Sequence, residues 1–487
     1  MERTQPAARP GVVVGILAFA GIVAALTQTL VVPLIGELPK MFGTSPSNAS
    51  WVITATLLAA AVATPVAGRL GDMFGKRRML MASLVPLVLG SVICALSSSV
   101  VPMIAGRGLQ GLGMGVVPLG ISLLRDVMPA EKLGSSIAIM SASMGVGGAL
   151  GLPFAAGIAE NSSWRVLFWV IAALALGVGA LIWLRVPADH SAATASRSFD
   201  FLGAIGLGIG LVCLLLGVSK GADWGWGSGT TLGLLIASAV VLLVWGRWEL
   251  RVSDPLVDLR VTARPQVLMT NAASVLVGFA MYAQSLVVPQ LLQLPVATGY
   301  GLGQSMLAMG LWMAPAGLMM MIMSPLGAKL SAAKGPKVTL AVGALIISIG
   351  YGLGVPFVDS GSTWTLLVVT LVCNTGVGFA YGAMPALIMS AVPQSETASA
   401  NSFNSLMRSI GTSVSAAVIA VVMAQMTTDF GGYALPSESG FRAAMLIGCG
   451  VGLAAAILAA LIPVRASAKP DLLVARPAAP EVTEAKA

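Results

Sequence analysis

Charged side chains are scarce in this sequence: Asp, Glu, Lys and Arg make up 9% of its 487 residues, against roughly 25% in soluble domains. This composition excludes a soluble enzyme. Hydrophobic residues make up 57% of the chain, and its mean hydropathy is +0.91. Apolar runs repeatedly reach the roughly 20 residues that a helix needs to cross a bilayer. Because the runs are continuous rather than alternating, they predict a polytopic helical membrane protein and exclude a β-barrel.

Histidine and cysteine are also rare. The single histidine, His190, lies in a polar loop, so a histidine-based metal site and a Ser-His-Asp hydrolase have no supporting signal. The four cysteines lie inside apolar runs without CxxC spacing, which is typical of small core residues: Cys94, Cys213, Cys373 and Cys449. No HExxH motif, paired intramembrane carboxylates or nucleophile with a base is present. We therefore expect no enzyme, no catalytic residue, no metal and no cofactor.

Apolar runs separated by charged or Pro- and Gly-rich breaks indicate fourteen transmembrane spans. Six spans form an N-terminal half over residues 11–186, two more follow at 201–247, and six form a C-terminal half over 267–463. Residues 1–10 and 464–487 are predicted as tails, and an even number of spans places both tails on one side. The sequence thus predicts an all-α membrane protein with two helices inserted between two six-helix halves.

The distribution of Lys and Arg predicts the orientation. If the chain starts in the cytoplasm, four cations fall in outer loops and two fall within spans: Lys40, Arg165, Lys220 and Arg442, and then Arg107 and Arg408. All other cations face the cytoplasm, as the positive-inside rule requires. We therefore expect a multi-pass protein of the plasma membrane with both termini in the cytoplasm. The formal net charge of +8 then reflects topology, and no nucleic-acid partner is expected.

An internal repeat relates the two halves. The stretch TPVAGRLGDMFGKRRML at 64–80 aligns with SPLGAKLSAAKGPKVTL at 324–340, an offset of 260 residues. A weaker echo pairs VMPAEKLGSS at 127–136 with VPQSETASAN at 392–401. Parallel repeats around a central cavity are typical of secondary transporters that work by rocking two halves.

Three segments carry motifs. Between the second and third spans, GRLGDMFGKRR surrounds one carboxylate with glycines and cations: Gly68, Arg69, Gly71, Asp72, Gly75, Lys76, Arg77 and Arg78. Glycines permit a tight approach of two helix ends, and one carboxylate among cations can form a switchable charge cluster at the cytoplasmic mouth. A simple helix cap in a positive loop is the alternative interpretation. We call this segment the gating loop.

The fourth span contains Arg107 well inside the hydrocarbon, followed by Gln110. An arginine at that depth costs about 2.5 to 3.5 kcal/mol on insertion scales, so we expect it to face a cavity or a partner, or to have a structural role. The fifth span has small residues at helical spacing together with a proline: Gly145, Gly147, Gly151, Pro153 and Gly157. This pattern favours close helix packing and bending.

These motifs resemble those of the major facilitator superfamily and, with fourteen spans, its 14-helix drug:proton antiporter family. The gating loop resembles the superfamily's signature loop, which latches the two halves when the transporter opens outward. Arg107 and Gln110 resemble a fourth-helix motif associated with proton coupling. The fifth span resembles the antiporter motif of exporters, with Gly-Leu-Pro in place of Gly-Pro. The resemblance implies a major facilitator fold, coupling roles for Arg107 and Asp72, and the proton gradient as energy source.

One position departs from that family. Its members commonly carry an Asp in the first helix, where this chain has Thr27, and no other Asp or Glu lies firmly within any span. The sequence therefore does not assign the coupled proton to a carboxylate at the membrane centre. The remaining candidates are Asp72, Glu37 at the outer end of the first span, and Asp126 after the fourth; each can equally be a solvated loop charge.

Polar and aromatic side chains inside spans are candidates for a substrate cavity, because lipid-facing positions disfavour them. The set is Gln28, Thr29, Gln110, Tyr282, Gln284, Asn374, Tyr381, Asn401, Asn404 and Arg408. The leading hypothesis is a monomeric, proton-coupled exporter of apolar or amphipathic small molecules that contacts its lipophilic substrates and membrane lipids. A dedicated exporter of a metabolite, lipid or self-made antibiotic is the alternative, and a membrane sensor or structural protein is the alternative from another class.

Overall fold

The computed structural model describes residues 10–31, 34, 38–187, 198–360, 362–430 and 433–463. Within these ranges, 14 helices are long and apolar enough to cross a membrane, which confirms the predicted fold class and number of spans. Residues 1–9 and 464–487 of the predicted tails lie outside the described residues, as do Glu37 and His190.

The helices before residue 187 form one bundle. They are α1 (Pro10–Thr29), the short α2 (Leu38–Phe42), α3 (Pro46–Phe74), α4 (Lys76–Leu96), α5 (Val100–Leu112), which continues through a 3₁₀ turn at Gly113–Gly115 into α6 (Val116–Val127), α7 (Ala130–Asn161) and α8 (Arg165–Arg185). Leu17, Leu80 and Leu119 are fully buried in a core shared by α1, α4 and α6. We call this bundle the first half.

The helices after residue 264 form a second bundle. They are α12 (Pro265–Gln293), α13 (Met306–Lys334), α14 (Pro336–Gly354), α15 (Thr363–Ala391), α16 (Thr397–Gln425) and α17 (Glu438–Leu461). Val277, Cys373 and Phe441 belong to its continuous apolar core. A hairpin of β1 (Thr427–Phe430) and β2 (Tyr433–Pro436) joins α16 to α17. We call this bundle the second half.

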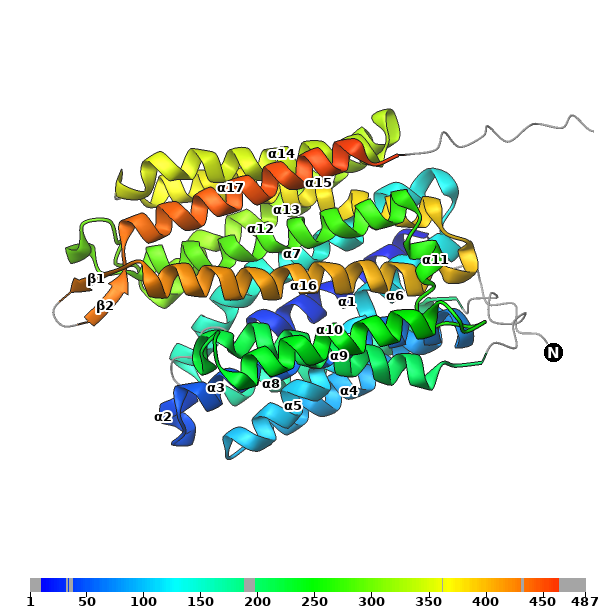
Figure 1. Ribbon diagram of the computed structural model, residues 1–487, viewed down its shortest axis with the longest axis horizontal. Helices are drawn as coiled ribbons and strands as arrows, with labels where there is room; N and C mark the ends of the chain where they lie inside the picture. The colour runs from blue at the N-terminus through cyan, green and yellow to red at the C-terminus, as the bar shows by residue number, and fades with distance from the viewer. Residues whose placement is uncertain are drawn as a thin grey trace, which may run out of the picture.

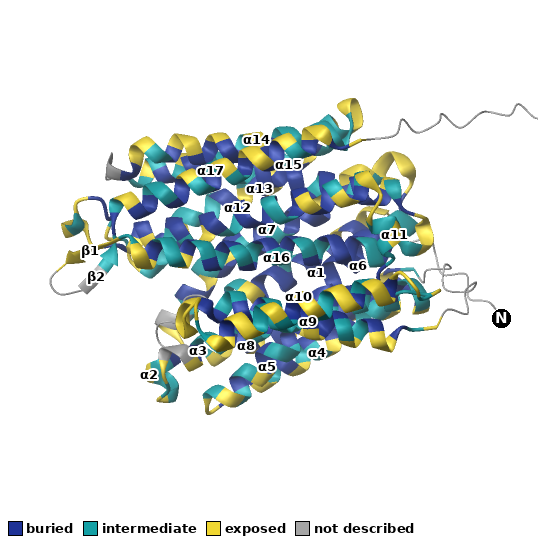
Figure 2. Ribbon diagram, viewed as in Figure 1, coloured by how far each residue is buried: buried dark blue, intermediate teal, exposed yellow. Residues whose placement is uncertain are grey.

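Helices α9 (Phe201–Trp224) and α10 (Gly229–Glu249) form an inserted pair that packs across the boundary between the halves. Leu207 and Leu211 of α9 share an apolar cluster with Ala61 of α3 and Phe403 of α16. Figure 1 shows α9 and α10 alongside α16, and Figure 2 shows many exposed residues on their outward faces. The inserted pair therefore contacts one helix from each half.

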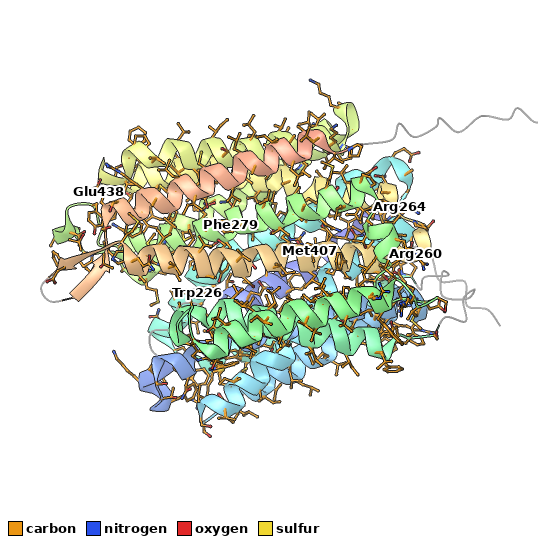
Figure 3. The ribbon with its side chains drawn as sticks, in the orientation of Figure 1. Trp226, Arg260, Arg264, Phe279, Met407 and Glu438 are labelled. Carbon is orange, nitrogen blue, oxygen red and sulfur yellow. The ribbon has the colours of Figure 1, made fainter. Side chains whose placement is uncertain are left out.

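The two ends of the bundle differ. The short α11 (Leu259–Thr262) lies at one end of the long axis and the β-hairpin lies at the other (Figure 1). Arg260 and Arg264 accordingly lie at the opposite end of the molecule from Trp226 and Glu438 (Figure 3). The end with α11 also carries the connection from α3 to α4 at Gly75, so we call it the Gly75 end and the other the hairpin end.

The gating loop is shorter than the sequence suggested, because most of it is helical. Helix α3 continues to Phe74 and α4 begins at Lys76, so Gly75 alone separates them. Gly75 has φ 100°, a left-handed conformation that favours glycine, and its N–H still donates to the Gly71 carbonyl. Gly335, its counterpart at the 260-residue offset, has φ 88° between α13 and α14. The repeat thus extends to the backbone conformation of the bend.

Candidate transport gate

Asp72 joins the two halves at the Gly75 end. Its Oδ1 accepts the N–H of Ala398 at 3.1 Å, and its Oδ2 accepts the N–H and the hydroxyl of Ser399 at 2.8 and 2.6 Å. Both residues lie in the first turn of α16, where backbone N–H groups have no partner within the helix. Asp72 therefore caps a helix of the opposite half, and its negative charge meets the positive end of that helix dipole.

A second set of contacts lies beside this cap. Arg125, near the end of α6, donates to the hydroxyl of Thr397 at 2.8 Å and to the Val392 carbonyl at 3.4 Å. Lys76 and Asp126 form an ion pair of 2.6 Å whose side chains are 2% and 5% exposed. Gln394 donates to the other oxygen of Asp126 at 3.1 Å. The carboxylate that follows the fourth span is therefore part of the same junction between the halves.

Close packing of backbone accompanies these hydrogen bonds. A Cβ on Gly68 would overlap the side chain of Ser402 and lie 2.7 Å from the Ala398 carbonyl oxygen. Ser122 donates to the Thr397 carbonyl at 3.2 Å, and Asn401 donates to Ser122 at 3.2 Å. Gly68 therefore permits α3 to approach α16, which brings Asp72 to the helix end.

These contacts define the state of the molecule. Among the described residues, hydrogen bonds between the two halves occur only in the part of the bundle toward the Gly75 end; the innermost of them joins Ser324 of α13 to the Ala138 carbonyl of α7 at 2.7 Å. The structure is thus closed at the Gly75 end by polar contacts between the halves.

The cations of the gating loop point in different directions. Arg69 is 5% exposed and lies 3.8 Å from Asp254, which follows the inserted helices. Arg77 donates to the Trp183 carbonyl at the end of α8, and Arg78 is exposed. Only Asp72 of this loop forms a hydrogen bond with the second half among the described residues, while Gly68 and Gly71 approach it sterically.

Arg107 is 2% exposed and holds three helices together. Its Nη1 donates to the Thr27 carbonyl of α1 and to Oε1 of Gln110, both at 2.7 Å, and its Nε donates to the Val52 carbonyl of α3 at 3.3 Å. The side-chain amide of Gln110 in turn donates to the Ser91 hydroxyl at 2.8 Å. Within the described residues no carboxylate pairs with Arg107, so carbonyl and amide oxygens stabilise the buried charge.

The glycines of α7 pack against two different helices, α1 and α13. The space beside Gly145 is filled by Met320 of α13, and Gly310 of α13 approaches Pro153. The spaces beside Gly147 and Gly151 are filled by Ile22, Ala25 and Thr29 of α1. Gly157 has open space around it. Helix α7 therefore packs on its own half with one face and on the second half with another.

Neighbouring glycines on α7 give a matched test of this packing. A Cβ at Gly147 would lie 2.6 Å from both the Ala25 Cβ and the Ile22 carbonyl oxygen, whereas Gly148 has nothing within 4 Å. We expect Gly147→Ala to destabilise the protein by about 1–3 kcal/mol through overpacking. Gly148→Ala should change stability by less than about 1 kcal/mol. Thermal unfolding of the two purified variants measures this, and equal effects would show that the α1–α7 contact tolerates a methyl group.

The residues predicted to line a substrate cavity fall into two groups. Some are used in helix contacts: Gln110 bonds to Arg107 and Ser91, and Asn404 of α16 donates to Asn271 and Ser274 of α12 at 2.8 Å each. Asn374 donates to a carbonyl of its own helix, and Asn401 belongs to the gate. Thr29 packs against α7, and Gln284 is buried.

The other group includes a buried contact between a cation and an aromatic ring, because Tyr381 and Arg408 are 4% and 8% exposed. The guanidinium of Arg408 lies 4.7 Å from the centre of the Tyr381 ring, and the Tyr381 hydroxyl contacts the Met281 sulfur at 2.9 Å. Gln28 is exposed and donates to the Met114 sulfur at 3.4 Å, and Tyr282 is partly exposed. Of the predicted set, the structure brings Tyr381 and Arg408 into direct contact.

Half of the gate has only a weak signal in the sequence. Thr397 and Ser399 belong to the weaker repeat echo, and Arg125 is one of many predicted cytoplasmic cations. The signal that these residues carry is the start of a helix after Pro393. The first N–H groups of a helix have no partner within it and need acceptors from elsewhere. The partner of that helix end could not be found without the fold.

The fold and this gate are those of a transporter that moves two halves against each other. The profile of the Major Facilitator Superfamily matches residues 17–416, and the chain therefore belongs to this superfamily of membrane transporters.

Several relatives are similar over much of the chain. An uncharacterised MFS-type transporter of Mycobacterium tuberculosis is 30% identical over 305 residues, a match that spans 62% of this chain but 43% of that protein. Multidrug resistance protein 3 of Bacillus subtilis is 26% identical over 86% of this chain and 80% of its own length. The tetracenomycin C resistance and export protein of Streptomyces glaucescens is 28% identical over 84% and 75%, respectively.

A solved structure shares the fold. The crystal structure of the human organic anion transporter MFSD10 superposes with a TM-score of 0.66 over 93% of this chain and all of that one, at 15% identity. This similarity agrees with the major facilitator fold predicted from the sequence.

Proposed function

We propose that the chain is a secondary active exporter that moves apolar or amphipathic small molecules, including drugs and antibiotics, out of the cell in exchange for protons. The observation that carries the proposal is the Asp72 cap on α16, which closes one end of the molecule by contacts that a relative movement of the halves would break. Alternating access requires such a reversible closure.

The orientation of the gate follows from charge. Most described cations outside the membrane centre lie at the Gly75 end, while Lys40, Arg165, Lys220 and Arg442 lie at the hairpin end. The positive-inside rule then assigns the Gly75 end to the cytoplasm. The described conformation is therefore closed toward the cytoplasm, with both termini on that side of the plasma membrane.

The substrate class rests on two lines of support. The contact between Arg408 and Tyr381 places a cation and an aromatic ring within the second half, buried in this conformation, and a movement of the halves that uncovers them would offer them to polarisable ligands. Relatives named for multidrug resistance cover most of the chain. The relative named for tetracenomycin C export supports the alternative of a dedicated exporter of one natural product. In either case the protein acts as a monomer on lipophilic substrates and is not an enzyme.

Transport of ethidium into inverted membrane vesicles tests this function. We expect uptake when the vesicle interior is acidified, collapse of uptake with an uncoupler, and normal uptake in Gly148→Ala, whose added methyl group meets open space. Uptake that persists without a proton gradient would contradict proton exchange. Failure to move ethidium, together with proton-driven uptake of a single natural antibiotic, would favour the dedicated exporter. A protein that binds both probes and moves neither is a sensor.

A further inference from the structure

Two acidic side chains face each other at the Gly75 end of the inserted helices. Asp200 precedes α9 and Glu249 ends α10, and their side chains are buried, with 9% and 2% of their residue surfaces exposed. A Cβ on Gly203 would overlap Oδ2 of Asp200 and lie 2.6 Å from Oε1 of Glu249. The two carboxylates therefore share one small space, which only a glycine at position 203 leaves open.

The environments of the two carboxylates differ. Asp200 accepts the Gly203 N–H at 2.8 Å and the indole N–H of Trp248 at 3.1 Å, and it caps the start of α9. These contacts stabilise a negative charge on Asp200. Glu249 accepts a long hydrogen bond from the Val257 N–H to Oε2 at 3.4 Å, and its buried Oε1 forms no hydrogen bond of good geometry. The buried indole N–H of Trp245, on the same helix, and the N–H of Leu256 face this carboxylate, but the indole forms no hydrogen bond of good geometry either.

No cation of the described residues pairs with these two carboxylates. Among the described residues, no Lys or Arg forms an ion pair with Asp200 or Glu249. The charged groups of the elements packed nearby have other contacts or are exposed. Arg69 of α3 faces Asp254, Arg260 donates to the Leu250 carbonyl, and Asp258 caps α11. Glu396 lies before α16, and Arg247 and Arg251 are exposed. Two unpaired negative charges in one buried space are costly, and a single proton removes one of them.

We propose that Asp200 and Glu249 form a proton-binding site in the inserted helices. A proton taken from water forms an O–H bond on Oε1 of Glu249, and that hydroxyl donates to Oδ2 of Asp200, which satisfies the buried oxygen that otherwise forms no hydrogen bond of good geometry. The ligand is the proton itself, and the site lies outside the gate and outside the motifs that resemble the drug antiporter family.

The site is connected to the gate by residues 253–258. Glu249 holds the Val257 N–H, and Leu256 and Val257 are buried in the cluster shared with α3 and α16. Asp254 of the same segment lies 3.8 Å from Arg69 of the gating loop. The segment also lines a cavity of about 100 Å³ that reaches Ser399, the residue bonded to Asp72. Loss of the proton restores repulsion between the carboxylates and loosens this segment from α3.

Infrared spectra and hydrogen exchange of the purified full chain test the site without any substrate. In difference spectra between low and high pH, we expect one C=O stretching component of a protonated carboxylic acid that is missing in Glu249→Gln and present in the control Glu396→Gln. In the wild type, the protection factor of residues 253–258, which is corrected for the base-catalysed rise of intrinsic amide exchange with pH, should fall about tenfold at high pH, as expected for losing a hydrogen bond of about 1.4 kcal/mol. Glu249→Gln should stay protected at both pH values, because the amide can still donate to Asp200.

Each other outcome overturns the proposal. An acid band that is identical in the wild type and Glu249→Gln, or a protection factor of 253–258 that does not depend on pH in the wild type, excludes a proton on this pair. Protection that returns at high pH when Na⁺ is added assigns the site to a metal cation instead. If Glu249→Gln does not fold, Asp200→Asn is the second variant: it should abolish the pH dependence of the protection factor, and an unchanged dependence refutes the pair. The infrared and exchange measurements test the proton site even if the proposed export function is wrong. Only the connection between this site and the gate rests on the proposed function.

Discussion

Replacing Asp72 with Ala should open the Gly75 end and stop transport. The carboxylate accepts three hydrogen bonds from the first turn of α16, and hydrogen bonds to a charged group are each worth about 1.5–3 kcal/mol. Even if water replaces most of that energy, the closed state should lose about 2 kcal/mol relative to the open one. A loss of that size changes the ratio of the two states roughly 30-fold.

Distance measurements between spin labels can detect this shift. Cysteines at Ser135 of α7 and Ser390 of α15 would carry the labels, because both residues are exposed at the Gly75 end and belong to different halves. Half-buried Cys213 and Cys449 are replaced by Ser in the same chain, whereas Cys94 and Cys373 are buried. We expect a longer label distance in Asp72→Ala, and a smaller change in Asp72→Asn, which keeps one acceptor oxygen.

The matched control for Asp72 is another aspartate with a local partner. Asp223 is 44% exposed and pairs with Lys220 three residues before it, so Asp223→Ala should leave the label distance unchanged. If Asp72→Ala keeps the wild-type distance, the cap does not hold the halves together. If the distance changes while ethidium uptake remains normal, the closure is real but does not limit transport.

Replacing Arg107 with Ala should destabilise the first half. Two effects oppose each other: removing a buried charge relieves about 2.5–3.5 kcal/mol of insertion cost, whereas three hydrogen bonds of a charged donor, at about 1.5–3 kcal/mol each, are lost. The hydrogen bonds outweigh the insertion cost, and the space left by the side chain adds to the loss. We therefore expect a net destabilisation of about 3 kcal/mol, seen as a lower Tm of the purified protein.

The Lys variant separates geometry from charge at this position. Arg107→Lys keeps the charge but lacks the planar fork that reaches α1, α3 and Gln110 together, so it should remain destabilised. Arg442→Ala removes an arginine from a surface pair with Glu438 and should change Tm little. Full stability of Arg107→Ala would show that the network is dispensable. Normal transport by Arg107→Lys despite reduced stability would indicate that charge alone serves coupling.

The sequence predicts the fold well because the membrane leaves few alternatives. Hydrocarbon requires each span to satisfy its backbone within a helix, so apolar runs give the helices almost directly. The helix ends were harder to place. The glycines and charges of the gating loop predict a loop between the second and third spans, but α3 and α4 continue through it to Gly75. Charge and glycine can occupy helix ends that lie outside the hydrocarbon.

Interactions between distant segments could not be predicted. Asp72 was recognised as a gating residue, but its partners are more than 300 positions away and are mostly backbone N–H groups, which leave no side-chain signature. The sequence predicts that Arg107 faces a cavity or a partner, or has a structural role; besides Gln110, its partners are carbonyl oxygens of α1 and α3, which leave no side-chain signature. Asp200 and Glu249 carry no distinctive sequence signal, because each stands alone at the edge of an apolar run.

The bends at Gly75 and Gly335 show that the two halves share a backbone plan, but their chemistry has diverged. Position 332, the counterpart of Asp72 at the same offset, is Ala332. The contact of α3 with α16 is therefore a charged helix cap, whereas its counterpart between α13 and α7 depends on the fit of small residues such as Gly145 and Gly317. A chain built by duplicating the first half would carry an aspartate at both junctions, and one built from the second half would carry none. In this chain one junction therefore responds to charge and the other to shape.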